Sequence, residues 1–171
     1  MLAFLAVTGR PHSRDKLATL FWPEMDQSKA RANLRRELSR FRSASQQDLL
    51  ITEGDQIGLN PEIDLWLDVR EYERLLGQAK SHGHLPLDPE ATGECPDCLK
   101  ALKQAVKLYT DDFMAGFSLP DSTEFDDWQF FQSESLRQSL ADALQVLIRW
   151  RSQAGVLDEA IVYAVSYTHL T

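Results

Sequence analysis

The segment from Lys29 to Arg42 concentrates side chains that bind anions. Six of its fourteen residues are lysine or arginine, and Glu37 is its single acidic residue. At the spacing of an α-helix, its apolar residues fall on one narrow face and the cations occupy the remaining arc. The four residues of the apolar face are Ala30, Leu34, Leu38 and Phe41.

The polar arc of this predicted helix carries the side chains that DNA-reading helices use. The arginine fork binds phosphate or pairs bidentately with guanine, and asparagine pairs with adenine. We expect phosphate contacts to position the helix and one or two residues to specify bases. The candidate DNA-binding residues are Lys29, Arg31, Asn33, Arg35, Arg36, Ser39, Arg40 and Arg42.

A solvated surface helix is the ordinary alternative for a run of cations. Two observations favour DNA. The cations are not interleaved with acids four residues away, as they would be on a salt-bridged surface helix. The net charge of the chain is −8, yet residues 1–60 carry nine basic and seven acidic residues, whereas residues 61–171 carry nine and nineteen. The basic footprint is therefore local to one element.

The neighbouring elements can hold this helix against a DNA groove. A short helix over residues 1–7 stops before Gly9, a second helix capped by Ser13 ends at Trp22-Pro23, and Asp26 or Ser28 caps the third. Residues 49–59 predict a β-hairpin that turns at Gly54-Asp55. Three helices and a hairpin form a winged helix, which we assign to residues 1–61 as a DNA-binding domain. It would press the third helix into the major groove.

The rest of the chain is helical by its pattern, so the predicted fold class is mainly α. We expect helices over 69–80, 98–109 and about 122–153, and a further helix that starts at Leu157 after Gly155. Two helices that meet at a glycine suggest a helical hairpin unit. Residues 62–165 form the second predicted domain, and 166–171 remain an unassigned tail. The apolar stripe of the long helix consists of Leu136, Leu140, Ala143, Leu144, Leu147 and Ile148.

These segments together resemble the antibiotic regulatory protein (SARP)-type activators. Ala3–Asp15, Leu20–Pro23 and Ala30–Arg42 resemble the OmpR-type winged helix at the front of that family. Asp64–Val69 and Leu108–Phe117 resemble its bacterial transcriptional activator domain, which has tetratricopeptide-like helices. The resemblance extends over nearly the whole chain to about position 164.

The resemblance implies a sequence-specific transcriptional regulator, most simply an activator. It implies that the third helix is the recognition helix, that residues 49–59 are the wing, and that the N-terminal strands of an OmpR-type domain are missing from this chain. It further implies self-association through the helical domain, a homodimer on repeated half-sites, and contacts with the transcription machinery, including RNA polymerase. The alternative is a helical protein–protein interaction scaffold that does not bind DNA.

Four residues between the second domain's first two helices could bind a metal. His82 and His84, then Cys95 and Cys98, offer four ligands that zinc accepts, and the two pairs are eleven positions apart. Against this, His-x-His is a weak motif, and a cysteine at the start of a helix can simply pack. From the sequence alone we expect no metal and no cofactor, with zinc at these four residues as the less favoured alternative.

Other patterns argue against an enzyme and against a membrane protein. We find no phosphate-binding loop, nucleophile elbow or His-Glu-x-x-His motif, so we expect no catalytic residues. The pairs Asp111-Asp112 and Asp126-Asp127 read as helix caps and solvated ends. Two cysteines and no span-length apolar run fit a cytoplasmic protein. The aromatic stretch 125–131 is expected to pack between helices, with an exposed binding surface as the alternative.

Overall fold

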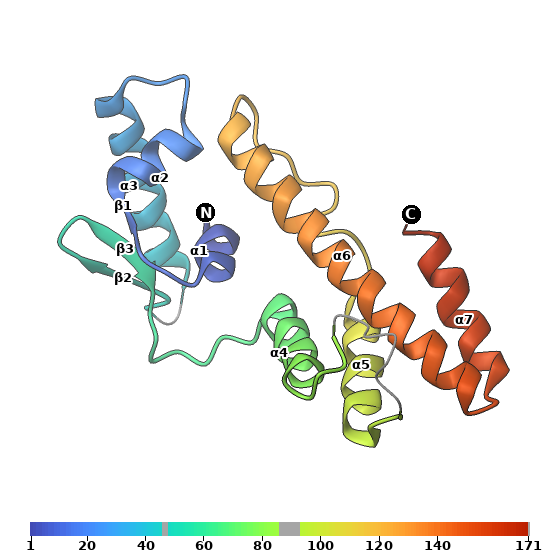
Figure 1. Ribbon diagram of the computed structural model, residues 1–171. Coiled ribbons are helices and arrows are strands. Elements are labelled where there is room, and N and C mark those ends of the chain that lie inside the picture. Colours follow the sequence, from blue (N-terminus) through green and yellow to red (C-terminus); the bar gives the residue numbers. More distant parts are fainter. Residues whose placement is uncertain (46–47, 86–92, 171) are drawn as a thin grey trace. The chain divides into compact units, whose positions relative to one another are not determined.

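The computed structural model describes residues 1–45, 48–85 and 93–170, and the chain divides into two compact units. The first unit comprises residues 1–67 and 116–129, and the second comprises residues 68–115 and 130–171. Over the described residues there are seven helices and one small sheet of three strands (Figure 1). The prediction of a mainly α chain is confirmed.

The first unit combines two short helices and one longer helix with the sheet. Its helices begin and end close to where their caps and breakers predict, and the hairpin forms around Gly54. In chain order its elements are α1 (Leu2–Thr8), β1 (His12–Ser13), α2 (Arg14–Phe21), α3 (Gln27–Ala44), β2 (Leu50–Glu53) and β3 (Gln56–Leu59).

Side-chain caps fix the starts of α2 and α3. The Ser13 hydroxyl oxygen accepts a hydrogen bond from the backbone N–H of Lys16 at 3.2 Å. Asp26 Oδ1 accepts from the backbone N–H groups of Ser28 and Lys29, both at 3.1 Å. Both predicted caps are confirmed, with Asp26 rather than Ser28 as the N-cap of α3. Each cap satisfies N–H groups that the helix itself cannot.

The sheet contains a strand that the sequence did not predict. Its order is β1-β3-β2, and all pairs are antiparallel. His12 of β1 and Thr52 of β2 both pair with Ile57 on the central strand, which is fully buried. A strand of two residues is too short to show an alternating pattern, so only its partner reveals it.

Residues 116–129 pack with the first unit. Phe125 is 1% exposed, and its ring lies 5.8 Å from that of Phe21 and 5.2 Å from that of Trp128. The Ser122 hydroxyl donates to the backbone carbonyl of Leu20 at 2.6 Å. The predicted domain division at 61/62 did not include this return. The compact units divide at 67/68, and residues 116–129, which lie within the second predicted domain along the chain, belong to the first unit.

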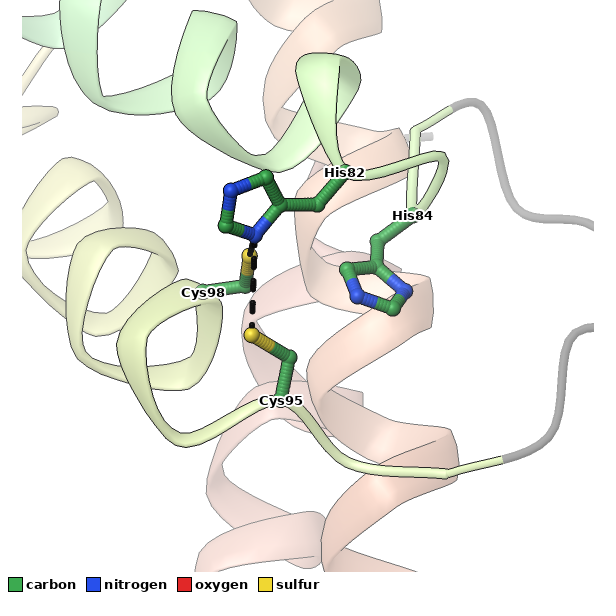
Figure 2. Close-up of side chains that lie close together, drawn as sticks. All are labelled: His82, His84, Cys95 and Cys98. Carbon is green, nitrogen blue, oxygen red and sulfur yellow. Dashed lines mark hydrogen bonds between the residues drawn. The ribbon is translucent and has the colours of Figure 1, made fainter.

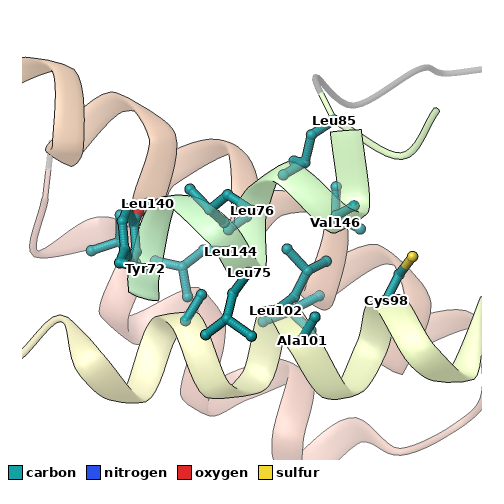
Figure 3. Packing of buried hydrophobic residues seen from close by; sticks show 14 of the residues in the cluster. Tyr72, Leu75, Leu76, Leu85, Cys98, Ala101, Leu102, Leu140, Leu144 and Val146 are labelled. Carbon is teal, nitrogen blue, oxygen red and sulfur yellow. The ribbon is translucent and has the colours of Figure 1, made fainter. Parts of the chain in front are cut away.

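The second unit is built on helices α4 (Asp68–Ser81), α5 (Pro96–Leu108), α7 (Leu157–Thr168) and the part of α6 (Thr123–Gln153) that follows residue 129. Its core forms where α4, α5 and α6 meet (Figure 3). The predicted apolar stripe of α6 is confirmed from Leu136 to Leu147, whereas Ile148 is partly exposed.

Helix α6 ends in a turn, and α7 then begins. Gly155 has φ 73°, and the N–H of Val156 donates to the carbonyl of Arg151 at 2.9 Å, which closes the helix end. Helix α7 continues to Thr168, so the unassigned tail starts inside a helix. Tyr167 packs on the core and its hydroxyl accepts from Gln145 Nε2 at 2.9 Å. Among the described helices, none has both the length and the apolar character of a membrane span.

The aromatic stretch of α6 is divided between burial and exposure. Phe125 is buried, but Phe130 and Phe131 are 59% and 68% exposed. The expectation of packing therefore holds for the first part of the stretch, where helical spacing turns Phe125 and Trp128 toward α1 and α2.

Two substitutions test this division. We expect Phe125→Ala to lower the free energy of unfolding by about 3–5 kcal/mol, because a fully buried ring is lost and a cavity remains. Phe130→Ala removes the same ring from an exposed position and should change it by less than about 0.5 kcal/mol. Urea unfolding followed by circular dichroism measures both. Equal effects would show that residues 116–129 are not part of a core.

The pKa of His12 predicts how the first unit responds to acid. The Thr8 hydroxyl donates to the Phe4 carbonyl at 2.7 Å, so it accepts from Nε2–H of the buried, neutral His12 at 2.9 Å. Burial, followed by the charges of Arg10 and Lys16, lowers the pKa of His12 below 6.5. The stability that the neutral ring contributes is therefore present above about pH 6.5 and is lost as pH falls toward the folded-state pKa.

We expect the wild type to lose its advantage in unfolding free energy over His12→Gln as the pH falls from about 7.5 to about 5.5. His12 then takes up a proton in the unfolded state, whereas the glutamine does not titrate. Thermal unfolding of both proteins over this range measures it. A difference that does not depend on pH would contradict the assignment of a neutral, buried His12.

Candidate functional site

Helix α3 buries one face and exposes its cations on the other. Ala30, Leu34 and Leu38 are at most 3% exposed, and Phe41 is partly exposed. Seven of the eight predicted DNA-binding residues are exposed, and the eighth, Asn33, is intermediate. The apolar face that the sequence predicted therefore anchors the helix and leaves the predicted polar arc facing solvent.

The polar arc consists of two rows at helical spacing, one on each side of the outermost line of the helix. The first row is Arg31, Arg35, Ser39 and Arg42. The second row is Lys29, Asn33, Arg36 and Arg40.

The first row borders α2 and the hairpin. Arg31 forms an ion pair with Asp15 of α2, to which it donates two hydrogen bonds. Arg42 Nη2 donates to Thr52 Oγ1 of β2 at 2.9 Å. Between them, the side chains of Arg35 and Ser39 have no hydrogen-bond or ion-pair partner within residues 1–45, 48–85 and 93–170.

The second row makes contacts within α3 and its cap. Lys29 pairs with Asp26 at 3.2 Å, and Arg40 pairs with Glu37 at 2.7 Å. Arg36 Nη1 donates to Asn33 Oδ1 at 3.2 Å. Exposed ion pairs of this kind contribute little to the free energy of unfolding, about 0–1 kcal/mol each.

These pairs correct one argument drawn from the sequence. Lys29, Arg31 and Arg40 each have an acidic partner, although no partner lies four residues away. Two of the acids lie three residues away, and the third, Asp15, belongs to another helix. The arc therefore carries less uncompensated charge than its composition suggests, and Arg35 is its clearest unpaired cation.

Arg14 is a functional candidate that sequence reasoning missed. It lies at the first position of α2, and its backbone N–H donates to the Asp55 carbonyl of the hairpin turn at 2.9 Å. Its side chain lines a surface depression with Arg35, Ser39 and Arg42. Among the described residues, the lining of this depression contains three arginines and no carboxylate. Nothing local in the sequence signals this meeting, because it depends on how α2 packs against α3.

Asp15 controls the charge of the first row. The hydrogen bonds from Arg31, followed by the one from Gln27, hold the pKa of Asp15 below its usual value of 3.8. Asp15 is therefore ionised at neutral pH and compensates the charge of Arg31. Arg35 and Arg14 have no such acid beside them in the depression.

The second unit brings His82, His84, Cys95 and Cys98 together. One ligand atom from each residue lies within 4.8 Å of the others. Figure 2 shows Nδ1 of His82 directed at both sulfur atoms, at 3.1 Å from Cys98 Sγ and 3.7 Å from Cys95 Sγ. These are the residues in this part of the chain that could hold a metal.

The two thiols of this cluster differ in acidity. The nearby backbone N–H of Cys98, followed by the His82 ring, lowers the pKa of Cys95 to about 7. Burial raises the pKa of Cys98 to about 12. Cys95 lies at the N-terminal end of α5, where the helix dipole favours a thiolate.

The paired aspartates have structural contacts. Asp112 accepts a hydrogen bond from the Tyr109 hydroxyl at 3.0 Å and pairs with Arg137 at 2.6 Å. Asp126 lies in the first turn of α6, where an acid complements the helix dipole. Asp126 thus has the helix-end position that the sequence predicted, whereas Asp112 is a partly buried residue of the loop that follows α5.

Comparisons with known proteins add no family to this description. No protein-family model matches the chain, and no curated protein is significantly similar to it in sequence.

Proposed function

We propose that this chain is a DNA-binding transcriptional regulator that places α3 in the major groove. The observation that carries the proposal is the pair of polar rows on α3, whose opposite face is buried in the first unit. A helix with a fixed apolar face and an exposed cationic arc can approach a polyanion without rearranging.

The dimensions of the helix and the groove agree. An α-helix with its side chains is about 10–12 Å across, and the major groove of B-DNA is about 12 Å wide. In this arrangement the two rows face opposite walls of the groove. Arg42 and Arg31 of the first row, and Lys29 and Arg40 of the second, would contact phosphates. Arg36 and Ser39, which lie nearest the outermost line, would reach base edges, with Asn33 as a polar helper, and Arg35 would add a phosphate contact beside Arg14.

The element order of the first unit supports a winged helix. A helix, a short strand, two helices and a hairpin follow one another, and the strand joins the hairpin in one sheet. The hydrogen bonds Arg42–Thr52 and Arg14–Asp55 tie α3 and the start of α2 to this hairpin. In the proposal the hairpin is the wing, and Arg14 adds a phosphate contact beside it.

The second unit would serve self-association or partner binding. The turn at Gly155 between α6 and α7 fits a tetratricopeptide-like unit, as the resemblance to SARP-type activators implies. Under this proposal the regulator is an activator that binds DNA as a homodimer and contacts RNA polymerase through its helical domain.

A second function is favoured by one surface. Leu157, Ile161, Val162 and Val165 of α7 are 50–62% exposed, which is unusual for aliphatic side chains on a single helix. A helical interaction scaffold without DNA binding would use such a surface. The regulator should bind DNA with an affinity that depends on salt, whereas the scaffold should not bind DNA.

The DNA proposal predicts a specific loss on removing Arg14. On generic duplex DNA, the affinity of the wild type should fall steeply as salt rises, since each phosphate contact releases counterions. Arg14→Ala should weaken binding equally on all sequences and reduce the salt slope by about one. Fluorescence anisotropy across a salt series measures both quantities.

Two further variants make this test specific. Arg35→Ala should weaken binding as well, whereas Arg74→Ala, which removes an exposed arginine from α4 in the second unit, should leave affinity and slope unchanged. Circular dichroism establishes that each protein is folded. A folded wild type that does not bind DNA would exclude the regulator and leave the scaffold.

The ion pair between Asp15 and Arg31 predicts a gain of affinity. Asp15→Asn removes the negative charge that compensates Arg31, so DNA affinity at low salt should rise and the salt slope should steepen by about one. Asp158→Asn is the matched control, because it removes an exposed first-turn aspartate of α7 in the second unit. If both variants bind alike, only the net charge matters and the first row is not at the interface.

A further inference from the structure

The turn after α4 brings two histidines to one end of the second unit's core. Gly83 has φ 76°, which favours glycine, and its N–H donates to the Lys80 carbonyl at 3.0 Å. The N–H of His84 reaches back to the Ala79 carbonyl at 2.9 Å. This pair of bonds is a Schellman motif, so His82 and His84 are held on either side of a fixed glycine.

The two cysteines occupy the first turn of the next helix. Cys95 is the N-cap of α5, Pro96 is its first residue, and Cys98 lies three residues after the N-cap. Positions separated by three residues lie on the same side of a helix, so both sulfur atoms face one point. Cys98 is fully buried at the end of the core, whereas Cys95 is half-buried.

Packing on α6 holds both pairs in place. The ring of His84 lies against that of Trp150 at 5.1 Å, edge to face, and the next residue, Leu85, is buried in the core. On the other side, Glu94 forms an ion pair with Arg151, directly before Cys95. Neighbouring residues of α6 therefore anchor the chain next to each pair.

The distances are those of a site that needs only a small contraction. Tetrahedral zinc with Zn–S of about 2.3 Å and Zn–N of about 2.0–2.1 Å places its ligand atoms roughly 3.3–3.8 Å apart. The His82 nitrogen lies 3.1 Å and 3.7 Å from the two sulfur atoms, and the whole set lies within 4.8 Å. Ordinary rotamer changes of exposed His82 and half-buried Cys95 would bring the four ligand atoms to the separations of a tetrahedral zinc site.

We propose that His82, His84, Cys95 and Cys98 bind one zinc ion as a structural site. Two thiolates and two imidazoles are a donor set that zinc prefers, and four protein ligands leave no open position for a substrate. The ion would join the C-terminal end of α4 to the N-terminal end of α5. This inference reverses the preference drawn from the sequence and is independent of DNA binding.

Two simpler explanations account for less of the geometry. Packing alone explains the burial of Cys98, but it does not explain why both sulfur atoms lie against a polar ring nitrogen. A redox pair of Cys95 and Cys98 would leave the convergence of His82 and His84 without a role.

Cobalt(II) is a direct probe, because it adopts the same tetrahedral site and absorbs visible light. The full chain, reduced and free of metal, is titrated with cobalt(II) and then with zinc(II). We expect one cobalt per chain, with the intense visible bands of a tetrahedral site and thiolate-to-cobalt charge transfer in the near ultraviolet. Zinc should abolish these bands and raise the melting temperature.

His82→Ala and Cys95→Ser test one ligand from each pair at positions that are not fully buried, where loss of folding is less expected than at Cys98. Each should lower the affinity for cobalt by more than about 100-fold, since losing an outer-shell partner alone costs 10–100-fold. His169→Ala removes an exposed histidine at the end of α7 and is the matched control. It should retain the wild-type spectrum and affinity.

Circular dichroism of the same samples separates a failed site from a failed fold. A metal-free wild type that gains helix when cobalt is added also supports the site, because binding is then coupled to folding. A folded, reduced wild type without the tetrahedral spectrum overturns the proposal. The proposal is also overturned if either variant, His82→Ala or Cys95→Ser, retains the tetrahedral spectrum and the wild-type affinity for cobalt.

Discussion

Burial of the apolar surface of α6 is the constraint on which both compact units depend. Within the first unit, the opening turns of α6 place Phe125 among aromatic rings. Ser122, the residue before α6, donates a hydrogen bond to the Leu20 carbonyl of α2. Within the second unit, its stripe from Leu136 to Leu147 fills the core between α4 and α5. Each unit is too small to lose such a contribution and remain well packed, because small cores have little stability to spare.

The local features of this chain could be predicted from its sequence, and the non-local ones could not. Helix ends followed from Ser13, Asp26 and Gly155, because caps and breakers act on their own neighbours. Strand β1 could not be predicted, since two residues become a strand only by pairing with β3. The same holds for residues 116–129, whose pattern predicts a helix start but not the partner that buries it.

The candidate DNA interface shows the same limit. Its residues were predicted, because amphipathic spacing alone separates the apolar face of α3 from the cationic arc. Its electrostatics were not, because Asp15 and Arg14 reach α3 from a different helix. One of them compensates a cation and the other adds a cation, so the charge available to a ligand depends on packing. Composition gives the number of cations, and tertiary contacts decide which of them are unpaired.

The cysteine-histidine cluster shows how helix packing can turn a weak motif into a site. The ten residues between His84 and Cys95 do not determine the distance between the two pairs, since a segment of that length can bring its ends together or keep them apart. What brings them together is the side-by-side packing of α4 and α5 in one core. A Schellman turn then fixes one pair of ligands and a helix N-terminus fixes the other. Much of the entropy that a metal must usually overcome to gather four ligands has thus already been lost when the helices fold.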